Sequence, residues 1–237
     1  MYTFTSRVRY TELNHQRGAM DPSSIINYFQ DCTTFHSEDL NLGITYLHEN
    51  NRIWLLTSWH LIIFKPIRLS EHITVGTWPY AFKGFYGYRN FVIKNKQEEI
   101  LAAADSIWAN MDTQTKLPVR VPEGNAGYTL EPPFPMEQAG RKIRIPGNLS
   151  TFPSFPVVKS NIDSYSHVNN GQYIKMAEEY LPEDFPVSEM RVEYKKQAVL
   201  GDIILPQTAV SGNIFTVVLS DPELKPYAII EFIRQLT

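Results

Sequence analysis

The chain has 237 residues, of which 43% are hydrophobic, and this is enough apolar material for one large or two small domains. Its formal net charge of -3 gives no global attraction to nucleic acid or to an anionic membrane. No apolar run approaches the roughly 20 residues of a membrane-spanning helix, and the first residues lack the pattern of a signal peptide. A single cysteine, Cys32, excludes an intrachain disulfide, so the sequence predicts a reducing, cytoplasmic setting.

The first half of the chain predicts a short strand, one helix and four longer strands. The first strand is expected over residues 2–10, and the helix begins at Pro22, because Asp21 suits the N-cap and proline suits the first helical position. Runs rich in Val, Ile, Phe, Tyr and Trp predict the four strands, over residues 53–67, 72–80, 85–94 and 99–111. Four residues recur at helical spacing on one face of the helix: Ile25, Phe29, Cys32 and His36. Cys32 is interpreted as a buried structural residue and not as a nucleophile.

The second half repeats the same order of elements. A strand is expected over residues 155–160, a helix over 168–180, and further strands over 190–199, 203–210, 215–219 and 227–236. The segment 61–65 also matches the segment 191–195 at an offset of 130 residues. Self-similarity of this kind indicates a duplicated domain.

The segment between the two halves is rich in proline, and residues 113–156 hold eight of the sixteen prolines. Such a segment forms neither a long helix nor a central strand, so we expect an extended connector over the surface. A helix followed by several strands, without alternating helices, favours an α+β fold with an antiparallel sheet. The expected domains are an N-terminal repeat over residues 1–112, a connector over 113–152 and a C-terminal repeat over 153–237.

Residues 163–170 read D-S-Y-S-H-V-N-N and are the most informative stretch of the chain. Asp163 lies four residues before His167, after an expected strand and at the start of an expected helix, and Tyr173 follows three residues after the run. One interpretation is structural: Asp163 caps a turn, and His167 is an ordinary residue before a helix. The pattern also resembles the active-site motif of hot-dog-fold thioesterases, which cleave acyl chains from a phosphopantetheine thiol.

The resemblance extends over residues 3–236, and the chain is similar to the bacterial branch of the acyl-acyl carrier protein thioesterases. The segments that carry it are residues 106–112, 120–122, 163–173, 193–198 and 201–202. It implies a double hot-dog fold, in which two repeats each wrap an antiparallel sheet around a long central helix and the second repeat is catalytic. It also implies hydrolysis without a metal or cofactor, acyl carrier protein as the partner, and a chain that is monomeric or pairs again as a homodimer.

The resemblance implies a role for each residue of the motif. Asp163 would act as a general base or as a nucleophile that gives a mixed anhydride. His167 would orient the thioester carbonyl or move a proton. The backbone amides of Val168 and Asn169, at the positive end of the helix, would form the oxyanion hole.

Two positions depart from the family's pattern. Tyr165 stands where the motif usually has asparagine, and its hydroxyl could donate to an oxyanion. Gln197 stands where relatives carry glutamate. Glutamine can hold a water but cannot take its proton, so general-base work is expected to fall on Asp163. The departures leave open a second class of function, an acyl-binding module with impaired catalysis.

The acyl chain and the carrier protein each need a binding surface. An apolar tunnel is expected at four residues that could equally be plain core: Ile25, Phe29, Trp54 and Trp59. Two basic clusters could dock an acidic carrier protein by electrostatic steering or could simply be solvated: Arg141, Lys142 and Arg144 in the connector, and Lys195 with Lys196.

The loop before the first helix, residues 14–20, lacks the acid-to-histidine spacing. The first repeat is therefore expected to be non-catalytic and to form the acyl pocket. His15 and Arg17 in this loop could reach the phosphopantetheine arm or be solvated. Two other enzymatic functions stay open: an acyl-CoA thioesterase, and a dehydratase of the same fold that acts on a 3-hydroxyacyl chain.

Overall fold

The computed structural model describes residues 1–14, 18–121, 127–137 and 139–235. Its internal packing divides the chain into two units. The first unit comprises Met1–Thr57 and Leu61–Gln138, and the second comprises Ser58–His60 and Ala139–Thr237. No helix of the described residues combines the length and the apolar character that crossing a bilayer requires.

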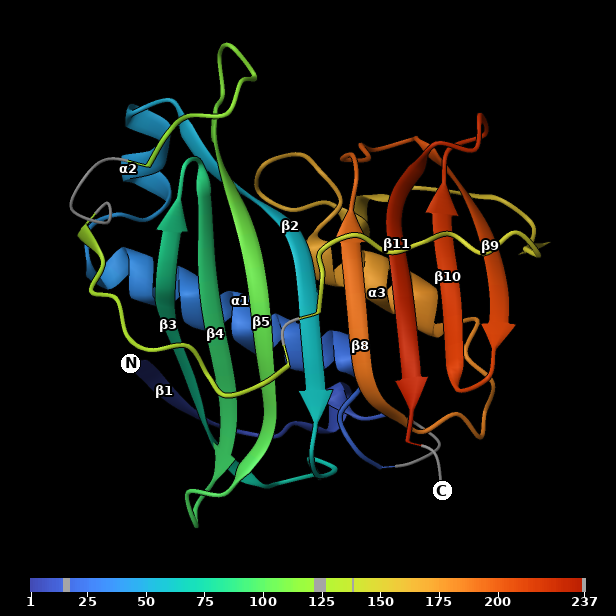
Figure 1. Cartoon of the computed structure of the whole chain (residues 1–237), viewed down its shortest axis with the longest axis horizontal. Coiled ribbons are helices and arrows are strands. Elements are labelled where there is room, and N and C mark those ends of the chain that lie inside the picture. Colours follow the sequence, from blue (N-terminus) through green and yellow to red (C-terminus); the bar gives the residue numbers. More distant parts are fainter. Residues whose placement is uncertain (15–17, 122–126, 138, 236–237) are drawn as a thin grey trace. The chain divides into compact units, whose positions relative to one another are not determined.

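The first part of the chain packs one long helix against antiparallel strands. Its elements are β1 (Tyr2–Arg7), the 3-10 turn η1 (Tyr10–Glu12), α1 (Pro22–Asp39), α2 (Ile44–Glu49), β2 (Arg52–Ile63), β3 (His72–Lys83), β4 (Tyr86–Asn95) and β5 (Ile100–Asp112). The strands lie in the order β1-β3-β4-β5-β2, and Figure 1 shows α1 running behind β3, β4 and β5.

Helix α1 begins and packs as the sequence predicts. Asp21 occupies its N-cap and Pro22 its first turn. Ile25, Phe29 and Cys32 are fully buried on one face. Burial raises the pKa of the Cys32 thiol to about 12, so Cys32 remains a protonated structural residue at neutral pH.

The second unit has the same order of elements with a shorter helix. Its elements are β6 (Ser150–Thr151), β7 (Phe155–Pro156), η3 (Lys159–Asn161), α3 (Asn170–Glu178), β8 (Val187–Tyr194), β9 (Ile203–Ser211), β10 (Ile214–Ser220) and β11 (Pro226–Arg234). The strands lie in the order β8-β11-β10-β9, and both β6 and β7 pair with β9. α3 has 9 residues against 18 in α1, so the expected pair of long central helices is not confirmed. Pro182 limits α3, because a proline disfavours helical backbone angles at the residue before it.

Several strands end earlier than the sequence predicts, among them those expected over residues 2–10, 155–160 and 190–199. Short 3-10 turns replace the ends of the first two. β8 ends at Tyr194 because the N–H groups of Lys195 and Lys196 both donate to the Tyr227 carbonyl, over 2.8 and 3.4 Å. Two donors on one acceptor turn the chain out of the ladder, as a bulge does.

The proline-rich connector lies on the face of the first sheet opposite α1 (Figure 1). Trp78 Nε1 donates to the Pro132 carbonyl over 2.8 Å, and the N–H of Phe134 donates to Asn90 Oδ1 over 2.9 Å. The Phe134 side chain packs against a buried cluster that includes Trp78. The connector therefore contributes apolar side chains to the core of the first unit.

In the second unit the connector again covers the outer face of the sheet. Ile143 packs with Val218 of β10 and Ile229 of β11, and Leu149 joins them. α3 packs against the other face of the same two strands (Figure 1). β10 is buried along almost its whole length because both of its faces are covered.

The loop that leads into α1 is closed by two backbone hydrogen bonds. The N–H of Asn14 donates to the Ala19 carbonyl over 2.7 Å. The N–H of Met20 donates to the Ile67 carbonyl over 2.8 Å, which ties the start of the helix to the segment after β2. η1 precedes this loop.

The loop that leads into α3 has the same backbone pattern. The N–H of Asp163 donates to the His167 carbonyl over 2.8 Å, and the N–H of Val168 donates to the Ala198 carbonyl over 2.9 Å. η3 precedes this loop as η1 precedes the first. The pattern defines four pairs of counterparts, first unit first: Asn14 and Asp163, Ala19 and His167, Met20 and Val168, Ile67 and Ala198. The first loop is one residue longer than the second.

Candidate active site

The acid and the histidine lie in a tight loop of residues 163–167, here called the motif loop. Asp163 Oδ1 accepts the N–H of Tyr165 over 2.8 Å and the N–H of His167 over 3.4 Å. Ser166 adopts a φ of 63°, a left-handed conformation that such a turn requires. One carboxylate oxygen therefore does cap the turn. The hydrogen bonds that Asp163 accepts from the described residues both go to Oδ1 and not to Oδ2.

His167 is half-buried and has one unsatisfied ring nitrogen. Its Nδ1 is buried and has no hydrogen-bond partner in the described part of the chain. A buried polar atom in this state calls for a reason, and a catalytic role is one. No group of the described residues fixes the tautomer, so the imidazole is able to carry its proton on either nitrogen.

The two amides expected to form an oxyanion hole are already bonded to protein carbonyls. The N–H of Val168 donates to Ala198, and the N–H of Asn169 donates to Asn161, both over 2.9 Å. The side chain of Asn169 accepts the N–H of Gly171 over 2.8 Å and caps α3. These groups stabilise the start of the helix, which speaks against the predicted oxyanion role of Val168 and Asn169.

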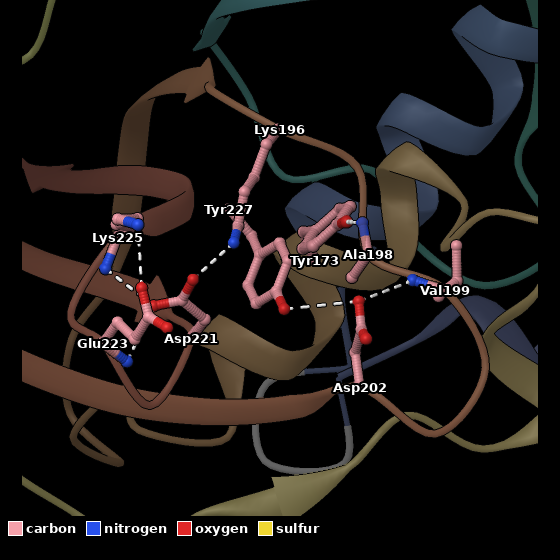
Figure 2. A network of polar contacts seen from close by, with 9 residues as sticks. All are labelled: Tyr173, Lys196, Ala198, Val199, Asp202, Asp221, Glu223, Lys225 and Tyr227. Carbon is pink, nitrogen blue, oxygen red and sulfur yellow. Dashed lines mark hydrogen bonds and ion pairs between the residues drawn. The ribbon is translucent and has the colours of Figure 1, made fainter.

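The chain after β8 forms a second loop, residues 195–202, here called the Gln197 loop. Its Ala198 is held on both sides: the N–H donates to the Tyr173 hydroxyl over 2.8 Å, and the carbonyl accepts the N–H of Val168. Figure 2 shows the Tyr173 hydroxyl pointing at Ala198. Because Ala198 follows Gln197 and Val168 follows His167, this contact brings the Gln197 loop against the motif loop.

The Tyr173 hydroxyl lies within reach of acidic groups. Burial raises the pKa of Tyr173 most, and electrostatic interactions with Tyr227, Asp202 and Asp163 raise it further. Tyr173 is therefore a neutral phenol at physiological pH. The interaction with Asp163 means that this carboxylate is within electrostatic range of the same hydroxyl.

Tyr165 and Gln197, which differ from the family's pattern, are both exposed. Tyr165 is 38% exposed in the motif loop. Gln197 is exposed in the Gln197 loop. Both side chains are therefore accessible to a ligand.

The four residues expected at an acyl tunnel lie in the core or at its margin. Ile25 and Phe29 are buried on α1, with the Phe29 ring centroid 5.0 Å from that of Phe91. Trp54 is half-buried on β2, and Trp59 is 1% exposed. These positions suit plain core, and an acyl-binding role for the four stays a prediction.

Glu193 brings the two expected basic clusters together. Its Oε2 accepts the N–H of Ile143 over 2.9 Å, and its Oε1 accepts the Lys195 ammonium over 2.8 Å. Ile143 separates Lys142 from Arg144, so these two exposed residues come close to Lys195. The three cations Lys142, Arg144 and Lys195 are here called the basic patch.

Arg141 and Lys196 have different surroundings. Arg141 is half-buried in the connector. The Lys196 ammonium is paired with Asp221 and lies 4.3 Å from the centre of the Tyr227 ring (Figure 2). The hydrogen bond from Lys196 lowers the pKa of the Asp221 carboxyl. Lys196 therefore helps to hold the Gln197 loop and is less available for docking than Lys195.

Sequence reasoning missed two residues that hold the Gln197 loop. Asp202 Oδ2 accepts the N–H of Val199 over 3.0 Å and the hydroxyl of Tyr227 over 3.3 Å. Asp202 belongs to one of the segments that carry the family resemblance, which could have pointed to it. Tyr227 gives no signal in the sequence, because its partners lie far away along the chain.

No group of three or more His, Cys, Asp or Glu side chains among the described residues is arranged to hold a metal ion. His15 and Arg17 of the first unit lie outside the described residues.

Two family models match the chain: the acyl-ACP thioesterase N-terminal domain over residues 1–126 and the acyl-ACP thioesterase C-terminal domain over residues 147–220. The chloroplastic acyl-[acyl-carrier-protein] hydrolase FATB1 of Cuphea viscosissima is 24% identical over 230 residues, which are 88% of this chain and 55% of that protein. The chloroplastic palmitoyl-acyl carrier protein thioesterase of Gossypium hirsutum is 24% identical over 222 residues, 84% of this chain and 54% of that protein. The chain thus spans about half the length of these curated relatives.

Two solved structures share the fold. An acyl-ACP thioesterase from Bacteroides thetaiotaomicron superposes with a TM-score of 0.90 at 22% identity and covers 98% of this chain and 97% of its own. The 12:0-ACP thioesterase from Umbellularia californica gives a TM-score of 0.82 at 17% identity and covers 99% and 98%. The predicted α+β class with antiparallel strands is confirmed. The N-terminal model alone matches more than half of the residues, and the chain belongs to the acyl-ACP thioesterase family.

Proposed function

We propose that this chain hydrolyses the thioester between a fatty acyl chain and acyl carrier protein and releases the free fatty acid. Membership of the family supports the reaction class, and the curated relatives are named for this reaction. The structural observation that supports the proposal is the hydrogen bond from Val168 to Ala198, because it joins the Gln197 loop to the loop of Asp163 and His167.

Asp163 supplies the carboxylate of the reaction through Oδ2. As a general base it takes a proton from water, the water oxygen bonds to the carbonyl carbon, the carbon–sulfur bond breaks, and the thiol leaves with the proton. As a nucleophile it attacks the carbonyl carbon itself, the thiolate leaves and takes a proton from His167 or from solvent, and water hydrolyses the resulting anhydride. Both routes balance without a metal or a redox partner.

His167 and Gln197 are assigned to the carbonyl and the water. The His167 imidazole donates to the thioester carbonyl oxygen or moves the proton to the leaving sulfur. The Gln197 carboxamide holds the attacking water without taking its proton. The Tyr165 hydroxyl is a further donor for the oxyanion. Since the Val168 amide is already bonded, side chains take over the stabilisation that the helix start was expected to give.

The basic patch is the docking surface that we assign to the carrier protein. Glu193 accepts the Lys195 ammonium with one oxygen and the N–H of Ile143 with the other, and Ile143 lies between Lys142 and Arg144 in the connector. Carrier proteins are acidic, so such a patch would speed their encounter with the enzyme by electrostatic steering.

We also infer a double hot-dog architecture for the chain. Residues 1–112 and 153–237 would be two copies of one unit joined by the connector of residues 113–152. The matched loops before α1 and α3 and the matched order of the elements support a duplication. Buried apolar residues of the N-terminal copy, such as Ile25 and Phe29, would face the acyl chain. A single buried cysteine suits a cytoplasmic enzyme.

A panel of acyl-acyl carrier protein substrates, from short to long chains, tests the proposed reaction. The matching acyl-CoA thioesters serve as the rival substrates. We expect the carrier-protein thioester to give the higher kcat/KM, and Asp163→Asn to abolish turnover while the substrate still binds. Turnover that is indifferent to Asp163→Asn would refute the assignment. Light scattering on the same samples separates a monomer from a homodimer.

A second candidate is an acyl-binding module without catalysis. Gln197 favours it, because a carboxamide at this position cannot replace a catalytic carboxylate. Tight binding of acyl carrier protein substrates by the unaltered chain, with no release of fatty acid, would establish this alternative.

A further inference from the structure

The Gln197 loop is fastened to its surroundings on both sides of Gln197 (Figure 2). The N–H of Lys196 donates to the Tyr227 carbonyl over 3.4 Å, and the N–H of Val199 donates to Asp202 Oδ2 over 3.0 Å. Gln197 itself is exposed and makes no hydrogen bond to any described residue. A polar side chain that is unoccupied on an otherwise fixed loop is well placed to meet a ligand with precise geometry.

Ala198, the residue that follows Gln197, is held in place by Tyr173. The Tyr173 hydroxyl reaches from the middle of α3 to the N–H of Ala198, 25 residues later in the chain, over 2.8 Å. The Tyr173 side chain is 2% exposed, and its ring packs edge-on against Tyr194 with centroids 5.9 Å apart. Because the ring is packed in this way, its hydroxyl fixes the position of Ala198 relative to α3.

The first unit makes the equivalent backbone connection without such a hydroxyl. Tyr173 lies four residues after the N-cap of α3, and the residue four after the N-cap of α1 is Ile25. The Met20–Ile67 hydrogen bond forms over 2.8 Å even so. The hydroxyl of Tyr173 is therefore an addition of the second unit and not a requirement of the fold.

We propose that Tyr173 is a positioning residue, whose hydroxyl acts through Ala198 to hold the Gln197 carboxamide opposite the motif loop. The effect on rate rests on the proposed hydrolysis, whereas the anchoring does not. Phenylalanine at this position would keep the packed ring and remove the acceptor of the Ala198 N–H, so the Gln197 loop would be held less firmly against the motif loop.

Steady-state kinetics on an acyl-acyl carrier protein substrate test the effect on rate. Tyr173→Phe is expected to lower kcat about tenfold with little change in KM. Tyr180→Phe is the matched control, because Tyr180 follows the same helix and packs edge-on against Phe152 at 4.9 Å, away from Ala198 in sequence and contacts. It is expected to change kcat by less than about twofold.

A double-mutant cycle with Gln197→Ala separates positioning from general stability. If Tyr173 acts through Gln197, adding Tyr173→Phe to Gln197→Ala should lower kcat by less than about twofold further. Additive losses, or no loss from Tyr173→Phe alone, would overturn the proposal.

Amide hydrogen exchange at Ala198, followed by NMR, tests the anchoring without any activity. Exchange is expected to be about tenfold faster in Tyr173→Phe than in the unaltered chain or in Tyr180→Phe. Equal exchange in all three proteins would overturn the anchoring. An unaltered chain that hydrolyses no acyl thioester would refute the proposed function, and the exchange result would still decide whether Tyr173 holds the loop.

Discussion

The loops before α1 and α3 close with the same two backbone hydrogen bonds but carry different side chains. Asn14 and Ala19 stand in the first unit where Asp163 and His167 stand in the second. Since the first loop closes with Asn14 and Ala19 at these two positions, closure does not need an acid and a histidine there. The comparison teaches that the fold requires the backbone pattern and leaves the side chains of this loop available for chemistry.

Some ionisable groups of the first unit belong to its core and not to a loop. In the first unit Arg89 is 6% exposed and lies 3.1 Å from both His36 Nδ1 and Thr77 Oγ1. Burial lowers the pKa of Arg89 to about 10, and burial together with Arg89 lowers the pKa of His36 to about 4. These groups are structural parts of the core, whereas Asp163 and His167 lie in a loop that a ligand can approach.

The largest expected effect concerns the histidine of the motif loop. His167→Ala should lower kcat about 10²- to 10³-fold, because it removes the group that donates to the carbonyl or moves the proton. Release of labelled fatty acid from the carrier-protein thioester measures the loss. Adding Asn14→Asp and Ala19→His to that variant rebuilds the acid and histidine in the first unit.

We expect this rebuilt pair to restore no activity. The first unit lacks a counterpart of the Tyr173 hydroxyl and of Gln197, so the two side chains alone are not a site. Recovery of turnover would contradict this expectation, because it would show that the two loops are chemically interchangeable.

The next effect concerns stability and is confined to the first unit. Asp105 is buried, and burial raises its pKa to about 6 against the hydrogen bonds from Tyr80, Ser106 and Asn90 that lower it. Its pKa is therefore higher in the folded than in the unfolded chain. The stability that the protonated Asp105 contributes to the folded chain is fully present below pH 3.8, the ordinary pKa of the group, and is lost as the pH rises through about 6.

Asp105→Asn cannot ionise and should escape this loss. Between pH 4 and pH 7 its free energy of unfolding should rise relative to the unaltered chain by about 2 to 3 kcal/mol. Denaturant titrations at the two pH values measure the difference, and His36 titrates in both proteins, so its effect cancels. A difference that is the same at both pH values would contradict the assignment.

A smaller effect is expected from the basic patch. Lys142→Glu, Arg144→Glu and Lys195→Glu together should lower kcat/KM for the carrier-protein thioester about tenfold at low salt, with less effect at high salt. Lys65→Glu is the matched control, because Lys65 is the residue of the first unit that aligns with Lys195 in the repeat. Equal losses on acyl-CoA, or from the control, would show that the patch does not select the carrier.

The smallest expected change is at Gln197. Gln197→Glu introduces the carboxylate that the family resemblance implies at this position, and we expect kcat to rise about three- to tenfold. A rise that appears only above the pH at which the new carboxylate ionises would identify it as a base. A fall in kcat would show that the carboxamide itself is needed and would sharpen the role given to Gln197.

Local pattern predicted much of this fold. The start of α1, its buried face at Ile25, Phe29 and Cys32, and the order of the strands all follow from spacing and caps within a few residues. The motif loop was found for the same reason, because the Asp163 N–H donates to the His167 carbonyl and Asp163 Oδ1 accepts the His167 N–H, all within five residues.

The features that the sequence did not predict depend on contacts between residues that are far apart along the chain. β8 stops at Tyr194 because of the Tyr227 carbonyl, which lies more than 30 residues away. The Val168 amide is occupied by Ala198, and Glu193 joins two basic clusters that looked separate in the sequence. Strand pairing determines each of these partners, so a local sequence pattern does not predict them.

The connector has a consequence for how this chain could be engineered. Phe134 packs on the sheet of the first unit, and Ile143 packs on the sheet of the second unit. The connector therefore covers apolar surface of both sheets. A glycine–serine linker of equal length would still join the two units. It would leave apolar side chains of the strands exposed to solvent. Uncovered sheet surface of that kind favours aggregation, so circular permutation or tag insertion belongs at the β-turns and not in this proline-rich stretch.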